Sequence, residues 1–409
     1  MGTKVEATRI AVIADSYWPV VSGGSLRVRL TVDSLLKAGF AVDVITPKPA
    51  KSWPSYTRNE DAEVYRFDES SVMGLPLSRA SREVDRLISR SQHNYDAIYL
   101  DRPGRQWESL VRRLTRKQCP LLVRFDPEDY VRPDANPAIS EAAIEMVISS
   151  VQSADAILAP NAEAERRATS LKAQVIRVDE RHEFLVDRSI GVRREVRRSF
   201  GDASHELMTS SADRILLSIA TGQDSMAIRS LLRQVGLLTE KNRQLRWWIL
   251  GHLPDREELY QQLKNHGWQY AVTMPGVITD IESALQIADL VLVASPTNQQ
   301  STVIDICVQN RVPYLVSNII SANEEPGKQS VTAAPLSKRV FDQQHFDANL
   351  SSGEGSLRDQ VETWLDDPSN LENRILALQN DWFAKQNSPS GISVGEAVGK
   401  FLRALSTKR

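Results

Sequence analysis

Three small residues near the start of the chain, Ser22, Gly23 and Gly24, have the types and position of a phosphate-binding turn. They lie between a short apolar run, residues 10–14, and a segment with apolar residues at helical spacing, residues 25–37. Glycine has no Cβ, so a ligand approaches its backbone closely. The helix N-terminus that follows offers free N–H groups and a partial positive charge. The alternative is a tight connection alone, since the spacing is not G-x-G-x-x-G.

A second candidate site is an acidic loop that holds Asp126, Glu128 and Asp129. It follows an apolar run, residues 121–125, that we expect to form a strand. Carboxylates accept hydrogen bonds, so this loop suits the hydroxyl groups of a ligand. The alternative is that it only begins a turn before Pro133.

Short apolar strands alternate with amphipathic helices along the chain, which is typical of doubly wound α/β sheets. The first set of expected strands covers residues 10–14, 42–46, 63–67, 97–100, 121–125, 156–159 and 174–178. The second set covers residues 214–220, 244–250, 270–274, 289–294 and 313–316. One of the expected helices, residues 106–117, is strongly basic.

The chain has 409 residues, too many for one ordinary core, so we expect two domains. The first, Rossmann-like, covers residues 1–200, and a polar linker covers 201–213. The second, also Rossmann-like, covers residues 214–390. The last segment, residues 391–409, is expected to be a helix that crosses back to the first domain.

The overall charge is nearly balanced, with 50 Lys and Arg against 52 Asp and Glu and a formal net charge of -2. This balance argues against a general nucleic-acid binder. Cys119 and Cys307 form no metal or disulfide pattern, and the six histidines lack metal-ligand spacing. We therefore expect no metal site and a reduced, cytoplasmic setting. No secretory signal or bilayer-spanning apolar run is recognised.

Several longer patterns resemble the retaining glycosyltransferases of family 4. They read D-S-Y-x-P-x-x-x-G-G, A-G-F-x-V-x-V-I-T-P, I-L-G-x-x-P-D-R-E-E-L and A-D-L-V-L-V-A-S-P, in the order that the family has. The resemblance is weakest across residues 48–95 and 317–390. It implies the GT-B architecture, in which two Rossmann-like domains face a central cleft. The N-terminal domain would then bind the acceptor, and the C-terminal domain the nucleotide sugar, with Ser22, Gly23 and Gly24 near the donor diphosphate.

The donor-site motifs depart from the family's pattern, which makes them degenerate. The family holds the leaving diphosphate with an Arg and a Lys, and Thr221 and Met226 stand at those positions. Its E-x7-E pair falls on Asn298 and Ile306, and Asp305 would reach the ribose if the helix shifted by one residue.

Other positions follow from the same comparison. A frequent family histidine falls on Phe125, beside Asp126, which is our candidate catalytic residue. The resemblance assigns donor binding to eight residues, which are Ser22, Gly23, Gly24, Thr221, Asn298, Ser301, Thr302 and Asp305. Cations that could replace the missing pair are Arg124, Arg177, Arg181 and Lys328.

Three functions remain open at this point. The first is an active, metal-independent hexosyltransferase that uses a nucleotide sugar as co-substrate, without another cofactor, and an unknown glycan, lipid-linked or small-molecule acceptor. The second is an inactive GT-B scaffold in glycan biosynthesis. The third, a nicotinamide-dependent enzyme, is disfavoured because no acidic residue follows the second strand, residues 42–46. The basic helix, residues 106–117, is either a solvated face or a peripheral contact with an anionic membrane.

Overall fold

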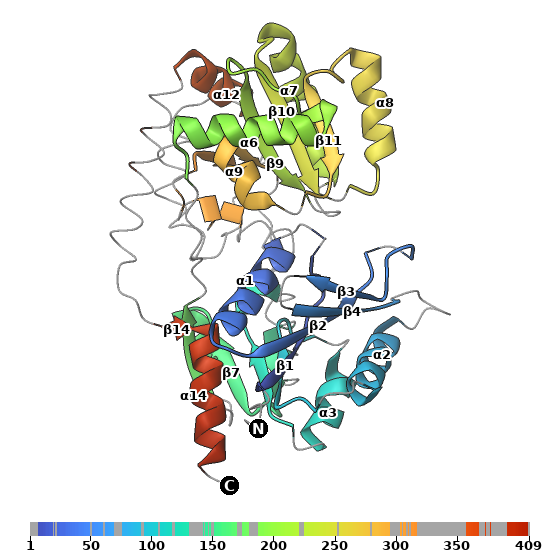
Figure 1. The fold of residues 1–409 in the computed structure, drawn as a ribbon, viewed down its shortest axis with the longest axis vertical. Helices are drawn as coiled ribbons and strands as arrows, with labels where there is room; N and C mark the ends of the chain where they lie inside the picture. Colours follow the sequence, from blue (N-terminus) through green and yellow to red (C-terminus); the bar gives the residue numbers. More distant parts are fainter. Residues whose placement is uncertain are drawn as a thin grey trace, which may run out of the picture. The chain divides into compact units, whose positions relative to one another are not determined.

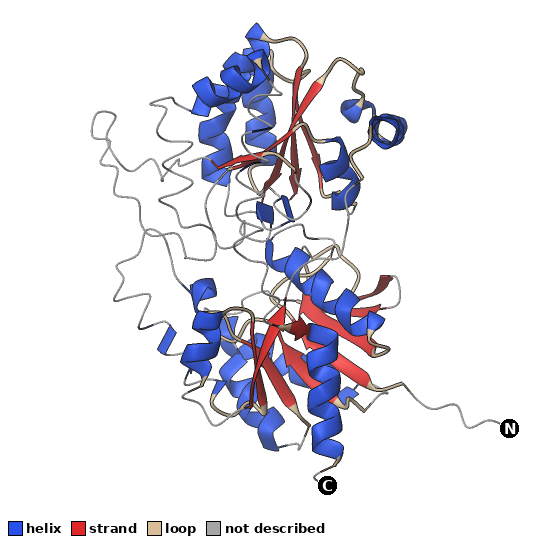
Figure 2. Cartoon of the chain, turned by 90° about the vertical axis from the view of Figure 1, so that its left-hand side faces the viewer, coloured by secondary structure: helices blue, strands red, loops and turns tan. Residues whose placement is uncertain are grey.

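The computed structural model divides the chain into two compact units. It describes residues 7–18, 20, 23–49, 51–59, 62–68, 76–90, 94–104, 107–116, 119–130, 142, 144–145, 147–148, 151–169, 174–179, 187–220, 225–251, 253–278, 280–294, 303–304, 306–307, 310, 312–316, 357–367, 373, 377 and 391–407. The first unit comprises residues 1–17, 24–180 and 389–409, and the second comprises 18–23 and 181–388. Each is built on a sheet with helices packed on it (Figure 1 and Figure 2).

The first unit contains a nine-stranded sheet in the order β14-β8-β7-β6-β5-β1-β2-β4-β3. The strands are β1 (Arg9–Ile13), β2 (Ala41–Pro47), β3 (Tyr56–Asn59), β4 (Ala62–Phe67), β5 (Ala97–Leu100), β6 (Leu121–Arg124), β7 (Ala156–Ala159), β8 (Gln174–Asp179) and β14 (Ile392–Ser393). All pairs are parallel except β3 with β4. The central strands are buried on both faces, which explains their continuous apolar sequences.

Helices of the first unit pack on this sheet through apolar faces. They are α1 (Gly23–Lys37), α2 (Pro76–Arg90), α3 (Glu108–Arg116), α5 (Ala162–Ala168) and α14 (Val394–Ser406), with a short 3-10 helix at Pro127–Tyr130. In the basic helix α3, Leu110 and Leu114 are buried in the core. Its Arg113 donates a hydrogen bond to the Ser81 carbonyl at 3.1 Å and lies 3.5 Å from the Asp85 carboxylate. Part of its basic face is thus paired with α2.

The second unit contains a five-stranded parallel sheet in the order β11-β10-β9-β12-β13. Its strands are β9 (Arg214–Ala220), β10 (Leu245–Gly251), β11 (Val272–Gly276), β12 (Leu290–Val293) and β13 (Tyr314–Val316). The helices are α6 (Ile190–Ala203), α7 (Ser225–Lys241), α8 (Arg256–His266), α9 (Ile281–Ile287) and α12 (Leu357–Asp366), with a short 3-10 helix at His205–Leu207.

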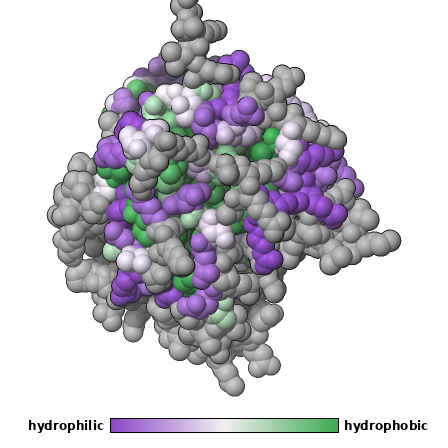
Figure 3. All heavy atoms as spheres, turned by 90° about the horizontal axis from the view of Figure 1, so that it is seen from below, coloured by the Kyte–Doolittle hydropathy of each residue, from purple (hydrophilic) through white to green (hydrophobic). Residues whose placement is uncertain are grey.

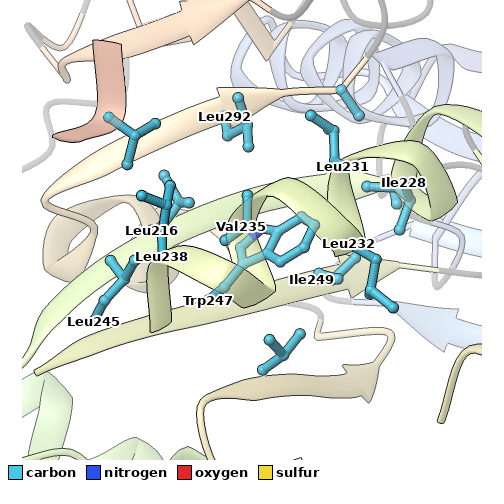
Figure 4. Packing of buried hydrophobic residues seen from close by; sticks show 14 of the residues in the cluster. Leu216, Ile228, Leu231, Leu232, Val235, Leu238, Leu245, Trp247, Ile249 and Leu292 are labelled. Atoms are coloured by element: carbon cyan, nitrogen blue, oxygen red, sulfur yellow. The ribbon is translucent and has the colours of Figure 1, made fainter. Parts of the chain in front are cut away.

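The core of the second unit is centred on Trp247, where α7 packs on the sheet (Figure 4). The Trp247 ring is fully buried, and its Nε1 donates a hydrogen bond to Ser218 Oγ at 3.0 Å. Ser218 in turn donates to the Leu292 carbonyl at 2.8 Å. These bonds link β10, β9 and β12 and satisfy the polar atoms inside the core.

The end of the chain belongs to the first unit. Strand β14 pairs in parallel with β8, with Ile392 opposite Val178. Helix α14 then packs against α1, where the Gly395 N–H donates to Ser34 Oγ at 3.0 Å. A Cβ at Gly395 would lie 2.2 Å from the Ser34 carbonyl oxygen, so this approach requires glycine.

The expected boundary between the domains differs from the division of the structure. The two units divide at residues 180 and 181 instead of near residue 200. Helix α6 continues through Gly201, which we expected to open the linker. The helix belongs to the second unit because Phe200 packs edge-on against Trp248 of β10, with ring centroids 5.7 Å apart.

No helix in the described part of the chain is both long and apolar enough to cross a bilayer. On the face drawn in Figure 3, the described residues are a mixture of hydrophilic and hydrophobic ones.

Candidate functional site

Four polar side chains gather where strands of the first sheet end. Asp15 follows β1, Asp101 follows β5, Asp126 follows β6, and Asn161 follows β7. These four strands are consecutive neighbours in the parallel sheet. Ligands of such sheets bind outside the carboxyl ends of the strands. We call Asp15, Asp101, Asp126 and Asn161, together with Arg27 and Arg124, the carboxyl-edge cluster.

Asp126 is held at this edge by two neighbours. Arg124 Nη2 lies 3.3 Å from Asp126 Oδ2, and Asn161 Nδ2 donates to Asp126 Oδ1 at 3.0 Å. Arg124 is 2% and Asp126 3% exposed. Asn161 is itself fixed, because its Oδ1 accepts the Ala164 N–H at 2.8 Å and caps helix α5. Both oxygens of Asp126 therefore accept hydrogen bonds from the protein.

Asp101 and Asp15 are anchored in a similar way. Arg27 of α1 binds Asp101 through two nitrogens, Nη2 at 2.7 Å and Nε at 3.3 Å from the two carboxylate oxygens. This bidentate geometry fixes the first turn of α1 beside the end of β5. Trp107 Nε1 donates to Asp15 Oδ1 at 3.2 Å.

The cluster combines fixed hydrogen-bonding groups with a helix N-terminus. Helix α1 begins at the glycine pair itself, Gly23 and Gly24, two residues earlier than the sequence pattern predicted. The first N–H groups of a helix have no partner within the helix, so this end suits a phosphate. The cluster can orient hydroxyl groups. Its charges are largely compensated, because Arg27 pairs with Asp101 and Arg124 with Asp126.

The other predicted site residues are only partly within the described structure. Ser22, Thr221, Asn298, Ser301, Thr302 and Asp305 lie outside the described residues. Ile306, which the resemblance aligns with the family's second glutamate, is an apolar side chain with 1% exposure. Phe125, which the resemblance aligns with the frequent histidine, is fully buried in the core of the first unit.

Two of the candidate replacement cations already have acidic partners. Arg124 pairs with Asp126, as described above, and Arg177 Nη1 lies 3.8 Å from Glu165. Arg181 and Lys328 lie outside the described residues. Neither Arg124 nor Arg177 is therefore a cation without an acidic neighbour.

Sequence reasoning found Asp126 but missed Arg27, Asp101 and Asn161. The sequence does mark Asp101 and Asn161 as candidates, because they come one and two residues after predicted strands. No sequence pattern marks the role of Arg27, because its partner Asp101 lies 74 residues away in the sequence. No cluster of three or more His, Cys, Asp or Glu residues suited to a metal occurs among the residues that the structure describes.

Comparison with known proteins gives matches in structure only. No protein-family model matches the sequence, and no curated protein does. Sucrose-phosphate synthase from Thermosynechococcus elongatus matches with a TM-score of 0.57 and 15% identity, over 98% of this chain and 100% of that one. WaaG, a glycosyltransferase involved in lipopolysaccharide biosynthesis, matches with a TM-score of 0.55 and 13% identity, over 96% and 99%.

Anabaena HepE, solved in complex with UDP and glucose, matches with a TM-score of 0.54 and 13% identity, over 97% of this chain and 99% of that one. At such identities the likeness concerns the fold. Together with the largely parallel first sheet and the parallel second sheet, it shows that this chain is an α/β protein of GT-B fold with two Rossmann-like units.

Proposed function

We propose that the protein is a divergent retaining glycosyltransferase that moves a hexose from a nucleotide sugar to an acceptor hydroxyl. The observation that carries this proposal is the fold match over nearly the whole chain to three proteins. One is named a glycosyltransferase, one is a sucrose-phosphate synthase, and one was solved with UDP and glucose. Fold alone does not define function, so the residues of the site must support the proposal.

The chemistry that we propose needs neither a metal nor a protein nucleophile. The leaving diphosphate takes the proton of the acceptor hydroxyl, while the bond to the anomeric carbon changes partner on the same face of the sugar. The protein then acts by stabilising the charge that develops on the diphosphate. The N-terminus of α1, with Ser22, Gly23 and Gly24, would contribute to this stabilisation.

The two units would divide the substrates between them. We assign the nucleotide to the second unit, with Thr221, Asn298, Ser301, Thr302 and Asp305 as the residues that would bind it. We assign the acceptor to the first unit, where Asp126 and the rest of the carboxyl-edge cluster offer hydrogen-bonding groups.

The acceptor would be a glycan, a lipid-linked sugar or a small molecule. A peripheral membrane contact through α3 would rely on exposed residues such as Arg112, because Arg113 is paired with α2. We assign the reaction to the cytoplasm, since Cys119 and Cys307 are free thiols that suit a reducing compartment.

A second candidate function is that of an inactive GT-B partner in glycan assembly. The observation that favours it is Ile306, which is buried and apolar where the family has a ribose-binding glutamate. Thr221 and Met226 add to this, because neither carries the positive charge that would stabilise a leaving diphosphate.

Calorimetric titration of the purified protein with UDP, GDP and ADP tests the proposal. We expect one of them to bind with a micromolar or lower Kd, and the variant Asp305→Ala to weaken that binding by at least about tenfold. Asp366→Ala, which removes an exposed carboxylate on α12, is the control. Release of the nucleotide from its glucose or mannose conjugate then measures turnover. Binding without release supports the inactive partner, and no binding to any nucleotide refutes the transferase.

A further inference from the structure

The second unit holds a pocket that the proposed reaction does not use. Its volume is about 740 Å³, within the range of small-molecule sites. We call it the arginine pocket, and its lining comes from α6, from the segment before β9 and from the start of β12. The charged residues of this lining include Arg193, Arg194, Arg197, Arg198, Arg214 and Asp289.

Positive charge exceeds negative charge in this lining. It contains five arginines, against three aspartates, Asp202, Asp213 and Asp289. Asp213 is further neutralised by Arg246, which lies 3.4 Å away. Asp289 is fully engaged, since it accepts hydrogen bonds from Arg193, from Arg197 at 3.0 Å and from the Ile215 N–H at 2.8 Å.

The remaining arginines are available to a ligand. Arg194 is exposed and forms no ion pair with any residue that the structure describes. The Arg198 side chain is 84% exposed, and its nearest acidic partner, Asp202, is 4.0 Å away. The Arg214 side chain is 44% exposed, and its Nη1 lies 3.9 Å from Asp289. Arg194 and Arg198 are four residues apart, so they lie on the same side of α6.

Nearby donors are also unsatisfied. Among the described residues, Thr209 Oγ1 and the Nε atoms of Arg193 and Arg197 are buried without a hydrogen-bond acceptor. Such donors cost free energy. An anion in the pocket adds negative charge beside the arginines that hold these donors.

The pocket lies at the amino ends of strands in the second sheet, opposite to the edge at which we propose that the nucleotide binds. Arg214 is the first residue of β9, and Asp289 directly precedes β12. Ligands of open α/β sheets bind at the carboxyl ends of the strands, whereas this pocket lies at their amino ends. It is thus a separate site, and its existence does not depend on the proposed transfer reaction.

We propose that the arginine pocket binds a phosphorylated small molecule. Guanidinium groups match phosphate oxygens in shape and charge, since each presents parallel N–H donors. Two exposed apolar side chains of the lining, Ile190 at 80% and Met208 at 57% exposure, would contact the uncharged part of that molecule.

Calorimetry with inorganic pyrophosphate, on the unmodified protein and on variants of the pocket, tests this site separately from a nucleotide site. We expect the double variant Arg194→Ala/Arg198→Ala, and Arg214→Ala alone, to bind pyrophosphate at least about tenfold more weakly than the unmodified protein. The matched control is Arg233→Ala/Arg256→Ala, which removes two exposed arginines elsewhere in the same unit. It should leave pyrophosphate binding unchanged.

Hydrogen exchange locates the bound pyrophosphate on the full chain. We expect amides of residues 190–203 and 209–214 to exchange more slowly when it is present. Equal binding by the unmodified protein and both pocket variants, loss of binding in the control, or no binding at all would overturn the proposal. These variants change residues of the arginine pocket alone, so a failure of the nucleotide assay leaves this test valid.

Discussion

Replacing Asp289 by alanine should selectively destabilise the second unit. This carboxylate is 2% exposed and lies at the start of β12. It accepts hydrogen bonds from two arginines of α6, Arg193 and Arg197, and from the Ile215 N–H of β9. The substitution removes the acceptor for all three donors at once. It also breaks the charged connection between α6 and the sheet.

The loss in the free energy of unfolding depends on the two arginines that Asp289→Ala leaves without their buried partner. Removing one partner of a buried ion pair costs about 3–5 kcal/mol. The side chains of Arg193 and Arg197 are 23% and 13% exposed, so water relieves part of this cost and we expect about 3 kcal/mol. Burial already lowers the pKa of Arg197, and Asp289 opposes that shift. The variant Asp289→Asn keeps one acceptor oxygen and the shape of the side chain, so it should lower the free energy of unfolding by about 1.5 kcal/mol less than Asp289→Ala.

Native-state hydrogen exchange measures this effect in each unit separately. The amides of β9 and β12 should open with a free energy about 3 kcal/mol lower in Asp289→Ala. The amides of β1 and β5 in the first unit serve as the internal reference and should be unchanged. A loss under about 1 kcal/mol in β9 and β12, the value of an ordinary surface ion pair, would refute the reasoning.

Two further predictions concern packing and acid stability. A Cβ at Gly236 would lie 2.3 Å from the Trp268 ring, so Gly236→Ala should lower the free energy of unfolding in urea by about 1–3 kcal/mol. The new Cβ of Gly399→Ala meets nothing closer than 3.7 Å, so this variant should raise the free energy of unfolding by up to about 1 kcal/mol. A lower free energy of unfolding in both variants would contradict the prediction that the contact at Trp268 decides the difference. Burial raises the pKa of Asp255, but hydrogen bonds from a serine hydroxyl and from Arg229 outweigh it and leave the pKa below its ordinary value. The Asp255 carboxylate thus stabilises the fold above about pH 4, and this stabilisation is lost as the pH falls through the folded pKa. The variant Arg229→Ala should raise the pKa of Asp255, which NMR titration measures. An unchanged titration midpoint would show that Arg229 does not lower this pKa.

The sequence predicted the buried parallel strands well, because their signal is local. Residues 97–100, 156–159 and 214–220 form strands with the expected bounds. Each is a short apolar run that the sheet buries on both faces. The sequence also placed Asp126 at the carboxyl end of such a strand, and the structure adds Asn161 and Asp101 beside it.

Elements without an apolar pattern escaped prediction. Helix α6 has no buried residue, so no apolar stripe marks it in the sequence. Strand β3 is an exposed edge strand and also lacks a signal. The ion pairs of Asp289 join residues 92 and 96 positions apart, and such partners become apparent only when the fold is known.

Strand β14 has a consequence for how the protein is made. Apart from residues 18–23, the sequence of the second unit is inserted between β8 and β14, two strands that pair in the sheet of the first unit. A nascent chain can therefore complete the contiguous sheet of the second unit before the sheet of the first is closed. Until β14 emerges from the ribosome, Val178 and Asp179 of β8 lack the strand with which they pair, and open strand edges attract other chains. Protection of that edge by chaperones would matter most in this interval of synthesis.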